Sequence, residues 1–251
     1  MLDDLGADVA LSGPPQRVVS LVPSLTEAIA VTVPGVLVGA TDWCTHPAGL
    51  DVTRVRGTKN PNRDLIAALH PDLVVANQEE NRRLDVDRLR AAGIPVWVIR
   101  IDSITEALNS LTRLFCEVFG LRQIDWIDEA REVWDRPPRL TGRVALPVWR
   151  DPWIWVGADT YPGDVLRRLG LANVVDEMRY PHLKISDALR RNPDLALLPD
   201  EPYPFTAADG PEALGPVRPV AVKGRSLFWY GPAMLKARDE LEAALLTQLH
   251  S

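Results

Sequence analysis

The sequence predicts an α/β protein with two Rossmann-like lobes, each built on a central parallel sheet, joined by one long helix with a ligand cleft between the lobes. Strand and helix patterns alternate in both halves of the chain, which is typical of parallel α/β sheets. Short motifs of the first half recur in the second half, and a helical segment separates the two sets. We therefore expect an N-terminal lobe at 1–102, the helical segment at 103–138 and a C-terminal lobe at 139–251.

The composition indicates a soluble globular protein. The 251 residues are 46% hydrophobic and 25% charged, values that suit one large domain or two modest ones. A net charge of −6 and the lack of a long basic run argue against nucleic acid and anionic membrane surfaces as partners. No apolar run approaches the roughly 20 residues of a membrane span, so membrane insertion is not expected. We expect a monomer.

The N-terminus does not have the pattern of a secretory signal. Met1-Leu-Asp-Asp carries neither a basic n-region nor an apolar h-region. The two cysteines, Cys44 and Cys116, do not decide the compartment. The sequence as written therefore indicates a cytoplasmic protein, or an extracytoplasmic one if a signal has been removed.

The first half alternates short strands and helices. Strands are expected at 9–11 and 17–22, on either side of a Gly-Pro-Pro turn. Ser24 and Glu27 have the spacing of a capping box, so a helix should begin here with Ser24 as its cap. The pattern then predicts strands at 37–40, 72–76 and 93–99, a short helix from Asn62 or Arg63, and a helix through Leu89.

Two helices are expected between residues 103 and 138. Ser103 and Glu106 form a second capping box, and apolar residues follow at helical spacing up to Gly120, which permits a change of direction. A second helix should run from Leu121 to the prolines at 137 and 138, with apolar residues on two sides. At about 1.5 Å per residue it would span roughly 20–25 Å and form a spine between the lobes.

The second half restarts the pattern with a strand at 143–148. Pro-Asp-Leu begins a strand at Pro71 and again at Pro193, an offset of 193 − 71 = 122 residues. Pro95-Val and Pro219-Val match at an offset of 219 − 95 = 124 residues. Two matches at nearly one offset predict duplicated lobes. A crevice at the carboxyl ends of their parallel strands is then the expected ligand site.

Four segments carry a family resemblance: Arg17-Val-Val-Ser-Leu-Val-Pro-Ser-Leu-Thr-Glu27, Val38-Gly-Ala-Thr-Asp42, Leu69-His-Pro-Asp-Leu-Val-Val75 and Asn192-Pro-Asp-Leu195. In order and spacing they resemble motifs of the class III periplasmic binding proteins, the helical-backbone receptors for cobalamin, ferric siderophores and heme. The likeness extends from Asp4 to about Leu245. It implies the solute-binding component of an ABC importer, which binds a metal chelate and requires no cofactor. The alternative is a cytosolic family member that has lost permease docking and acts as an intracellular carrier or an enzyme.

Catalytic motifs are not evident, so an enzyme is not expected. Ser24 is not surrounded by a Gly-x-Ser-x-Gly elbow, and the chain has no glycine loop of the phosphate-binding type. Glu79 and Glu80 follow a strand, where carboxylates often act on ligands, although such runs are also common in solvated loops. Glu79 is therefore one candidate ligand contact.

Cys44 and His46 offer two soft metal ligands two residues apart in a loop. A structural zinc site needs about four ligands, and no second pair completes one, so no direct metal site is expected. Two interpretations remain. These residues are an ordinary loop thiol and a solvated imidazole, or one of them reaches the metal of a bound chelate or the edge of the ligand.

Aromatic residues concentrate between Trp149 and Tyr230, in segments broken by proline and glycine. Aromatic side chains in loops cannot all enter a sheet core, so some should line a surface cleft, Trp155 among the candidates. Such a cleft suits a large, flat, partly apolar ligand. The family resemblance adds cleft positions in both lobes: Ser24, Trp43, Thr58, Lys59 and Asn77 in the first, and Trp153, Tyr180 and Trp229 in the second.

The resemblance also implies permease contacts. Exported family members carry an acidic residue near the start of the short helix in each lobe, and these acids dock onto arginines of the membrane permease. Asp64 holds the first position here, one methylene shorter than the usual glutamate, and Ser186 with Asp187 beside it holds the second. This departure and the missing signal pattern keep the cytosolic alternative open.

Overall fold

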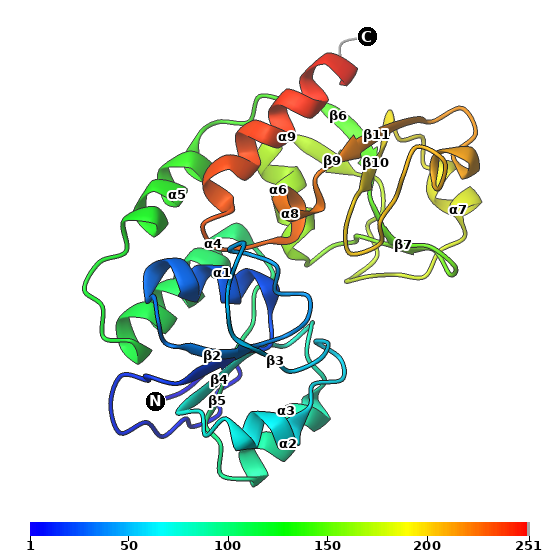
Figure 1. Cartoon of the computed structure of the whole chain (residues 1–251). Helices are drawn as coiled ribbons and strands as arrows, with labels where there is room; N and C mark the ends of the chain where they lie inside the picture. The colour runs from blue at the N-terminus through cyan, green and yellow to red at the C-terminus, as the bar shows by residue number, and fades with distance from the viewer. Residues whose placement is uncertain (250–251) are drawn as a thin grey trace. The chain divides into compact units, whose positions relative to one another are not determined.

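The computed structural model of the chain describes residues 1–249, which form two compact units, each with its own parallel sheet (Figure 1). Unit 1 comprises residues 1–101, 105–128 and 230–232, and unit 2 comprises 102–104, 129–229 and the chain from 233 onward. Among the described residues, no helix combines the length and the apolar character that a membrane span requires.

Unit 1 contains a five-stranded sheet in the order β3-β2-β1-β4-β5, in which every neighbouring pair is parallel. The two central strands are fully buried and rich in valine, as expected of a parallel sheet covered on both faces. The strands are β1 (Val18–Ser20), β2 (Leu37–Ala40), β3 (Thr53–Arg54), β4 (Leu73–Asn77) and β5 (Val96–Ile99).

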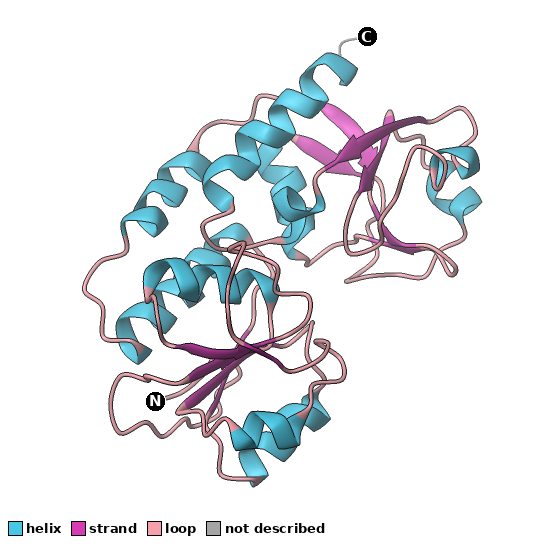
Figure 2. Cartoon of the chain, in the orientation of Figure 1, coloured by secondary structure: helices cyan, strands magenta, loops and turns pink. Residues whose placement is uncertain are grey.

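Helices cover both faces of this sheet (Figure 2). On one face lie α2 and α3, whose Ile66, Val86 and Leu89 are buried against Val74 and Val98 of the sheet. On the other face lie α1 and α4 (Figure 1). The four helices are α1 (Pro23–Thr32), α2 (Arg63–Ala68), α3 (Arg83–Ala91) and α4 (Ile104–Arg113).

Unit 2 contains a four-stranded parallel sheet in the order β11-β10-β6-β9, and an antiparallel hairpin, β7-β8, continues from the end of β6. Helices α6, α8 and α9 lie on one side of this sheet and α7 on the other (Figure 1). The elements are β6 (Gly142–Ala145), β7 (Pro147–Trp149), β8 (Ile154–Trp155), α6 (Tyr161–Leu169), β9 (Leu171–Asn173), α7 (Ile185–Leu189), β10 (Leu195–Pro199), β11 (Arg218–Val222), α8 (Gly224–Phe228) and α9 (Met234–Leu249).

The two sheets share one strand order, which confirms the predicted duplication. The order β2-β1-β4-β5 in unit 1 corresponds to β9-β6-β10-β11 in unit 2. A pair of polar contacts is repeated as well. The backbone N–H of Arg17 donates to Asp72 at 2.9 Å, and its guanidinium donates to a carbonyl oxygen of the turn before β4. Arg143 makes the corresponding contacts with Asp194, at 2.7 Å, and with the turn before β10.

Two local predictions at the start of the chain are wrong. Residues 9–11 form no strand, and Leu2 and Asp8 make an isolated antiparallel bridge instead. Ser24 does not cap α1, because Pro23 already occupies the first helical turn and Val22 is the N-cap residue. Proline has no N–H to satisfy, and its fixed φ suits the first helical position. The Ser24 hydroxyl is buried without a hydrogen-bond partner.

The predicted helical segment is more broken than expected. After α4 the chain makes a π-helical turn, Leu114–Val118, and it changes direction at Gly120, which has a φ of +74°. The next helix, α5 (Asp125–Asp135), begins later than the predicted Leu121. Its 11 residues span about 16 Å rather than roughly 20–25 Å. The chain passes from unit 1 to unit 2 within α5, and the three-part division at 102 and 138 stays a prediction.

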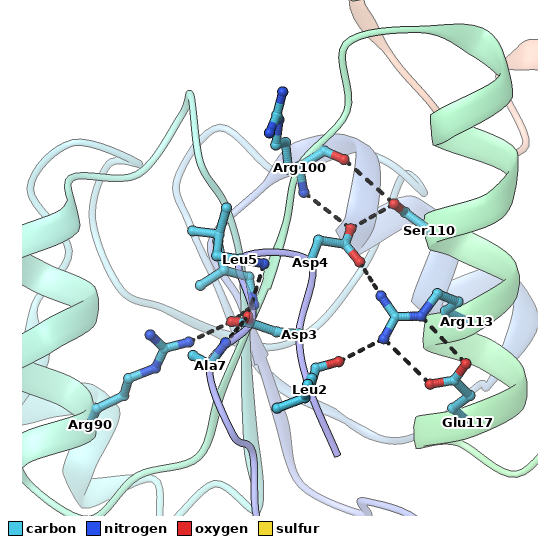
Figure 3. A network of polar contacts seen from close by, with 11 residues as sticks. Leu2, Asp3, Asp4, Leu5, Ala7, Arg90, Arg100, Ser110, Arg113 and Glu117 are labelled. Atoms are coloured by element: carbon cyan, nitrogen blue, oxygen red, sulfur yellow. Dashed lines mark hydrogen bonds and ion pairs between the residues drawn. The ribbon is translucent and has the colours of Figure 1, made fainter.

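A network of polar contacts holds the first residues of the chain to unit 1 (Figure 3). Asp3 is 3% exposed and accepts a hydrogen bond from Arg90 at 2.6 Å. Asp4 accepts from Arg113 and Ser110 of α4, both at 2.6 Å. The two neighbouring carboxylates thus anchor the N-terminal segment to α3 and α4.

Candidate ligand-binding site

The carboxyl ends of the strands in unit 1 carry most of the predicted ligand residues of the first half. Three of them, Trp43, Cys44 and His46, follow β2, and Thr58 and Lys59 follow β3. Asn77 is the last residue of β4, and Glu79 follows it. Because the strands are parallel, their carboxyl ends lie at one edge of the sheet. Ligands of open α/β sheets bind at this edge.

Two buried asparagines support the loop after β4. Asn77 Oδ1 accepts from the backbone N–H groups of Glu79 and Glu80, at 2.7 and 3.2 Å. Asn81 Oδ1 accepts from the N–H of Asn77 at 2.8 Å, and its Nδ2 donates to the carbonyl oxygen of Thr58 at 3.0 Å. Asn77 is 3% exposed, so its side chain supports the edge from inside rather than facing a ligand.

Lys59 and Glu80 place a cation and a carboxylate at this edge of unit 1. Lys59 Nζ donates to the carbonyl oxygen of Glu79. Partial burial lowers the pKa of Lys59, and the negative charge of Glu80 opposes that shift. The hydroxyl of Tyr230 donates to Glu80 Oε1 at 3.4 Å, so a residue from near the end of the chain also contributes to the edge.

Trp43 stands out from the surface of unit 1. Its side chain is 66% exposed, a larger fraction than for any other large apolar residue described. The half-buried His46, in the same loop, has Nδ1 at 3.1 Å from the hydroxyl of Thr45. An ordered tryptophan that shows this much surface offers a flat apolar contact to a ligand.

Cys44 lies inside the core, which contradicts a contact between its thiol and a bound metal. The residue is 0% exposed, and its Sγ lies 3.0 Å from the Thr26 hydroxyl and 3.1 Å from the Thr41 hydroxyl. Burial raises the pKa of the Cys44 thiol, although both threonines oppose the shift. Metals bind the thiolate, and burial disfavours that form. Ser24, at 3% exposed, is likewise no surface contact.

Unit 2 gathers five aromatic side chains into a chain of ring contacts, which we call the aromatic row. Its members, in order of contact, are Trp149, Tyr203, Phe205, Trp153 and Trp155, with ring centroids 5.4, 4.7, 5.9 and 5.7 Å apart. The tryptophans belong to the β7-β8 hairpin, and the other two belong to the loop after β10. Trp149 is 43% exposed and Trp155 is 0% exposed, so the row leads from the core to the surface.

The remaining predicted residues of unit 2 differ in exposure. Trp155 is a core residue whose indole N–H donates to the carbonyl oxygen of Leu183 at 3.1 Å, so it cannot touch a ligand as predicted. Trp229 is 7% exposed, and the Arg225 guanidinium lies over its indole, with the guanidinium carbon 5.3 Å from the ring centroid of Trp229. Trp153 and Tyr180 are half-buried and keep part of their surface.

A carboxyl group in a dry environment lies next to Trp229. Burial and the neighbouring Asp200 raise the pKa of Glu201, while a hydrogen bond from Trp229 and the charge of Arg225 oppose the shift. Glu201 Oε1 is buried without a hydrogen-bond partner. Any side chain at Gly224 would collide with the backbone of Glu201, so the start of α8 and the end of β10 require a glycine there.

The predicted docking residues lie on corresponding helices of the two units. Asp64 is exposed in the first turn of α2, which precedes β4. Ser186 is exposed in the first turn of α7, which precedes β10, and Asp187 beside it forms an ion pair with Arg190. The offset of 186 − 64 = 122 residues equals that between Asp72 and Asp194, so Ser186 is the counterpart of Asp64.

Sequence reasoning missed several residues of these edges. Asn81 and Tyr230 reach the edge of unit 1 through contacts distant in sequence, which no local pattern reveals. Trp149 and Tyr203 belong to the aromatic-rich region, but their mutual contact depends on the pairing of β7 with β8. Within residues 1–249, no group of three or more His, Cys, Asp or Glu side chains is arranged to hold a metal ion.

No protein-family model matches the chain. The chain is 24% identical over 213 residues to an uncharacterised ABC transporter substrate-binding lipoprotein of Bacillus subtilis, covering 79% of this chain and 68% of that protein. It is 25% identical over 194 residues to a vitamin B12-binding protein of Vibrio vulnificus, covering 72% of this chain and 70% of that protein.

Solved structures match the fold of this chain over most of its length. A periplasmic heme-binding protein of Pseudomonas aeruginosa matches 94% of each chain with a TM-score of 0.75 and 22% identity. The CeuE protein of Helicobacter pylori, in a Ni-His complex, matches 100% of this chain and 89% of its own with a TM-score of 0.80 and 14% identity. The fold is that of the class III periplasmic binding proteins. The family resemblance expected from the sequence motifs is thereby confirmed.

Proposed function

We propose that this protein is the solute-binding component of an ABC importer and that it binds a metal chelate of the cobalamin, ferric-siderophore or heme type. The periplasmic binding protein fold, matched over 94% of the chain or more, carries the proposal. The names of the curated relatives support it, since they are an ABC substrate-binding lipoprotein and a vitamin B12-binding protein. The chelate is cargo in this proposal, and no cofactor takes part.

The site geometry supports binding rather than catalysis. Each unit exposes one tryptophan, Trp43 in the loop after β2 and Trp149 at the end of β7, and such side chains suit a large flat ligand. The relatives are named as binding proteins, which favours a receptor over a carrier or an enzyme inside the cell. We therefore place its work outside the cytoplasm, where it would deliver its ligand to a permease.

Isothermal titration calorimetry against cyanocobalamin, hemin and ferric siderophores tests the proposal. At least one chelate should bind with a Kd below about 10 μM, or about −7 kcal/mol. Trp43→Ala should weaken that binding by roughly ten- to a hundredfold, because stacking and burial of a tryptophan supply about 1–3 kcal/mol.

The control variant is Val31→Ala, which truncates a residue of α1 that is 52% exposed and should leave binding unchanged. Trp43→Ala should unfold at the same denaturant concentration as the parent, because an exposed side chain leaves no core cavity behind. Failure of every chelate to bind below this limit refutes the receptor function. Normal binding by an unstable Trp43→Ala would show that Trp43 is structural.

A further inference from the structure

The aromatic row ends at the surface in two rings that are fixed before any ligand arrives. Trp149 meets Tyr203 edge-on, with an interplanar angle of 78°. The Tyr203 hydroxyl donates to Asp209 Oδ2 at 2.6 Å, and Tyr203 packs against the buried Phe205. Two of the contacts behind them are stacked, at 15° and 21°. An exposed aromatic ring held in this way loses little conformational freedom on binding.

Carboxylates surround the arginine beside this row. The Arg150 guanidinium lies 5.6 Å from the ring centroid of Trp153. It pairs with Asp209, with Glu212 at 2.5 Å and with Asp151 at 3.7 Å. Its positive charge is therefore outnumbered by the three carboxylates that contact it, and it is not available to pair with an anionic ligand.

A second guanidinium of unit 2 also lies over a tryptophan and near a carboxyl group. Arg225 lies over Trp229 and feels the charge of Glu201, which follows Asp200 at the end of β10. Asp200 Oδ1 accepts from the N–H of Gly224, at the start of α8. Glu201 thus senses a second carboxylate, Asp200, as well as the guanidinium of Arg225.

From this combination we infer that the aromatic row selects a chelate with a flat conjugated ring and an uncharged rim, a corrinoid in type, over chelates that carry carboxylates or phenolates. The rigid rings of Trp149 and Tyr203 favour a flat partner. The excess of carboxylates around Arg150 repels anionic groups that approach the row. This inference rests on the proposed receptor function and narrows its ligand class.

Four chelates separate the effects of shape and charge. Cyanocobalamin is flat and neutral overall, hemin is flat and carries two carboxylates, a ferric trihydroxamate is neutral without a large conjugated ring, and a ferric tris-catecholate is anionic without such a ring. Calorimetry should find cyanocobalamin bound at least tenfold tighter than each of the other three. Hemin affinity should rise with salt, because screening weakens repulsion between exposed charges.

Charge variants test the repulsion directly. Asp151→Asn combined with Glu212→Gln should raise hemin affinity about tenfold and leave cyanocobalamin affinity within twofold, because the hydrogen bond between Tyr203 and Asp209 stays intact. The matched control is Glu132→Gln with Asp239→Asn, which removes the same two charges from exposed positions on α5 and α9. If the control changes hemin affinity as much as the test pair does, net charge is responsible and the inference falls.

A truncation tests the ring contact. Trp149→Ala should weaken cyanocobalamin binding about tenfold, and Trp149→Phe should retain most of the affinity. Circular dichroism melting of both variants checks that the fold survives, as expected for a side chain that is 43% exposed. Size-exclusion chromatography at the titration concentration tests whether this surface instead contacts a second copy of the chain. If the parent is a dimer that Trp149→Ala dissociates while cyanocobalamin binding is unchanged, the rings contact a second copy and the inference is refuted.

Two failures can be told apart. If hemin, the trihydroxamate or the tris-catecholate binds as tightly as cyanocobalamin, the selectivity is refuted while the receptor function stands. If no chelate binds below 10 μM, both are refuted.

Discussion

Single side chains at the carboxyl edges have properties that only their surroundings explain. Glu201 follows the last strand residue of β10 by two positions, in a segment that looks like an ordinary polar loop. In the fold its Oε1 is buried without a partner, and burial next to Asp200 raises its pKa. A carboxyl group in such a place holds its proton more tightly than it does in the unfolded chain.

The parent should lose stability as the pH rises and Glu201 ionises, and Glu201→Gln should abolish this loss. The folded-state pKa lies above the ordinary value of 4.5, so the folded chain keeps a proton that the unfolded chain has released. The stabilisation from this group is present below pH 4.5 and is lost as the pH rises through the folded-state pKa. Glutamine does not ionise, so the variant should gain stability relative to the parent toward neutral pH. Urea unfolding across this range measures the difference.

The control for this prediction is Glu129→Gln, at an exposed position on α5. Its stability profile should run parallel to that of the parent. A parallel profile for Glu201→Gln as well would show that the carboxyl group ionises normally in the fold.

Residue types at the site were predictable from the sequence, but their burial was not. Cys44, Trp155 and Ser24 were expected to face a ligand and are buried instead. Contacts with distant segments accompany this burial in two cases, since Thr26 lies against Cys44 and the carbonyl oxygen of Leu183 accepts from Trp155. Trp43, one residue before Cys44, is exposed. Position in a loop therefore does not reveal which of two adjacent side chains turns outward.

At the scale of elements, the end of α5 depends on a buried ion pair. Arg238 of α9 is 1% exposed and donates to Glu242 Oε1 at 2.9 Å. The same guanidinium donates to the carbonyl oxygens of Val133, Arg136 and Pro137, at 3.1, 2.8 and 2.6 Å. The last carbonyl groups of a helix have no partners within the helix, and a cation suits that end of the helix dipole. α9 thus caps α5 within unit 2.

Arg238→Met should lower the free energy of unfolding by about 3–5 kcal/mol, because the buried Glu242 carboxylate loses its closest cation and keeps only Arg139 at 3.4 Å. The carbonyl groups of Arg136 and Pro137 lose this donor as well. Adding Glu242→Leu should recover part of that loss, since the buried carboxylate that lost its closest cation is then gone. Arg136→Met is the control, because it breaks an ion pair with Asp239 between exposed side chains and one exposed hydrogen bond to the Val133 carbonyl oxygen, and it should cost less than about 1 kcal/mol. Guanidinium unfolding of the four proteins decides, and equal losses for Arg238→Met and Arg136→Met would contradict a capping role.

Elements with strong local signals were predicted and those without them were not. The Pro-Asp-Leu motifs correctly marked the start of β4 and β10, because proline ends one element and the apolar run begins the next. The single strand expected at 143–148 is two, β6 and β7, and the second pairs away from the sheet with β8. That pairing depends on contacts with residues far along the chain. Helix α5 begins late because Leu121 to Ile124 follow the turn at Gly120 rather than starting a helix.

At the scale of the whole molecule, the duplication was the most informative signal in the sequence. Two short motifs at nearly one offset predicted duplicated lobes, and the structure confirms them with two sheets of the same strand order. The same offset identifies counterparts that have diverged. Asp64 in unit 1 corresponds to Ser186 in unit 2, where the nearest carboxylate, Asp187, is already paired with Arg190. The two units therefore present unequal charges on corresponding helices.

This inequality predicts that docking to a permease, if the proposed function holds, depends mainly on unit 1. Asp64→Ala should weaken docking about tenfold or more, because Asp64 is exposed and its neighbour Arg63 is paired with Asp85, so that the carboxylate of Asp64 can pair with a cation of the partner; tenfold corresponds to about 1.4 kcal/mol. Asp187→Ala should weaken it less than about threefold. Ser186→Glu should strengthen it, since it restores a charge at the position equivalent to Asp64. A vitamin B12 ABC importer in proteoliposomes is the probe, and its ATP hydrolysis is measured against the concentration of each variant. Equal effects of Asp64→Ala and Asp187→Ala would refute the asymmetry, and no stimulation by the parent protein would show that this importer is not its partner.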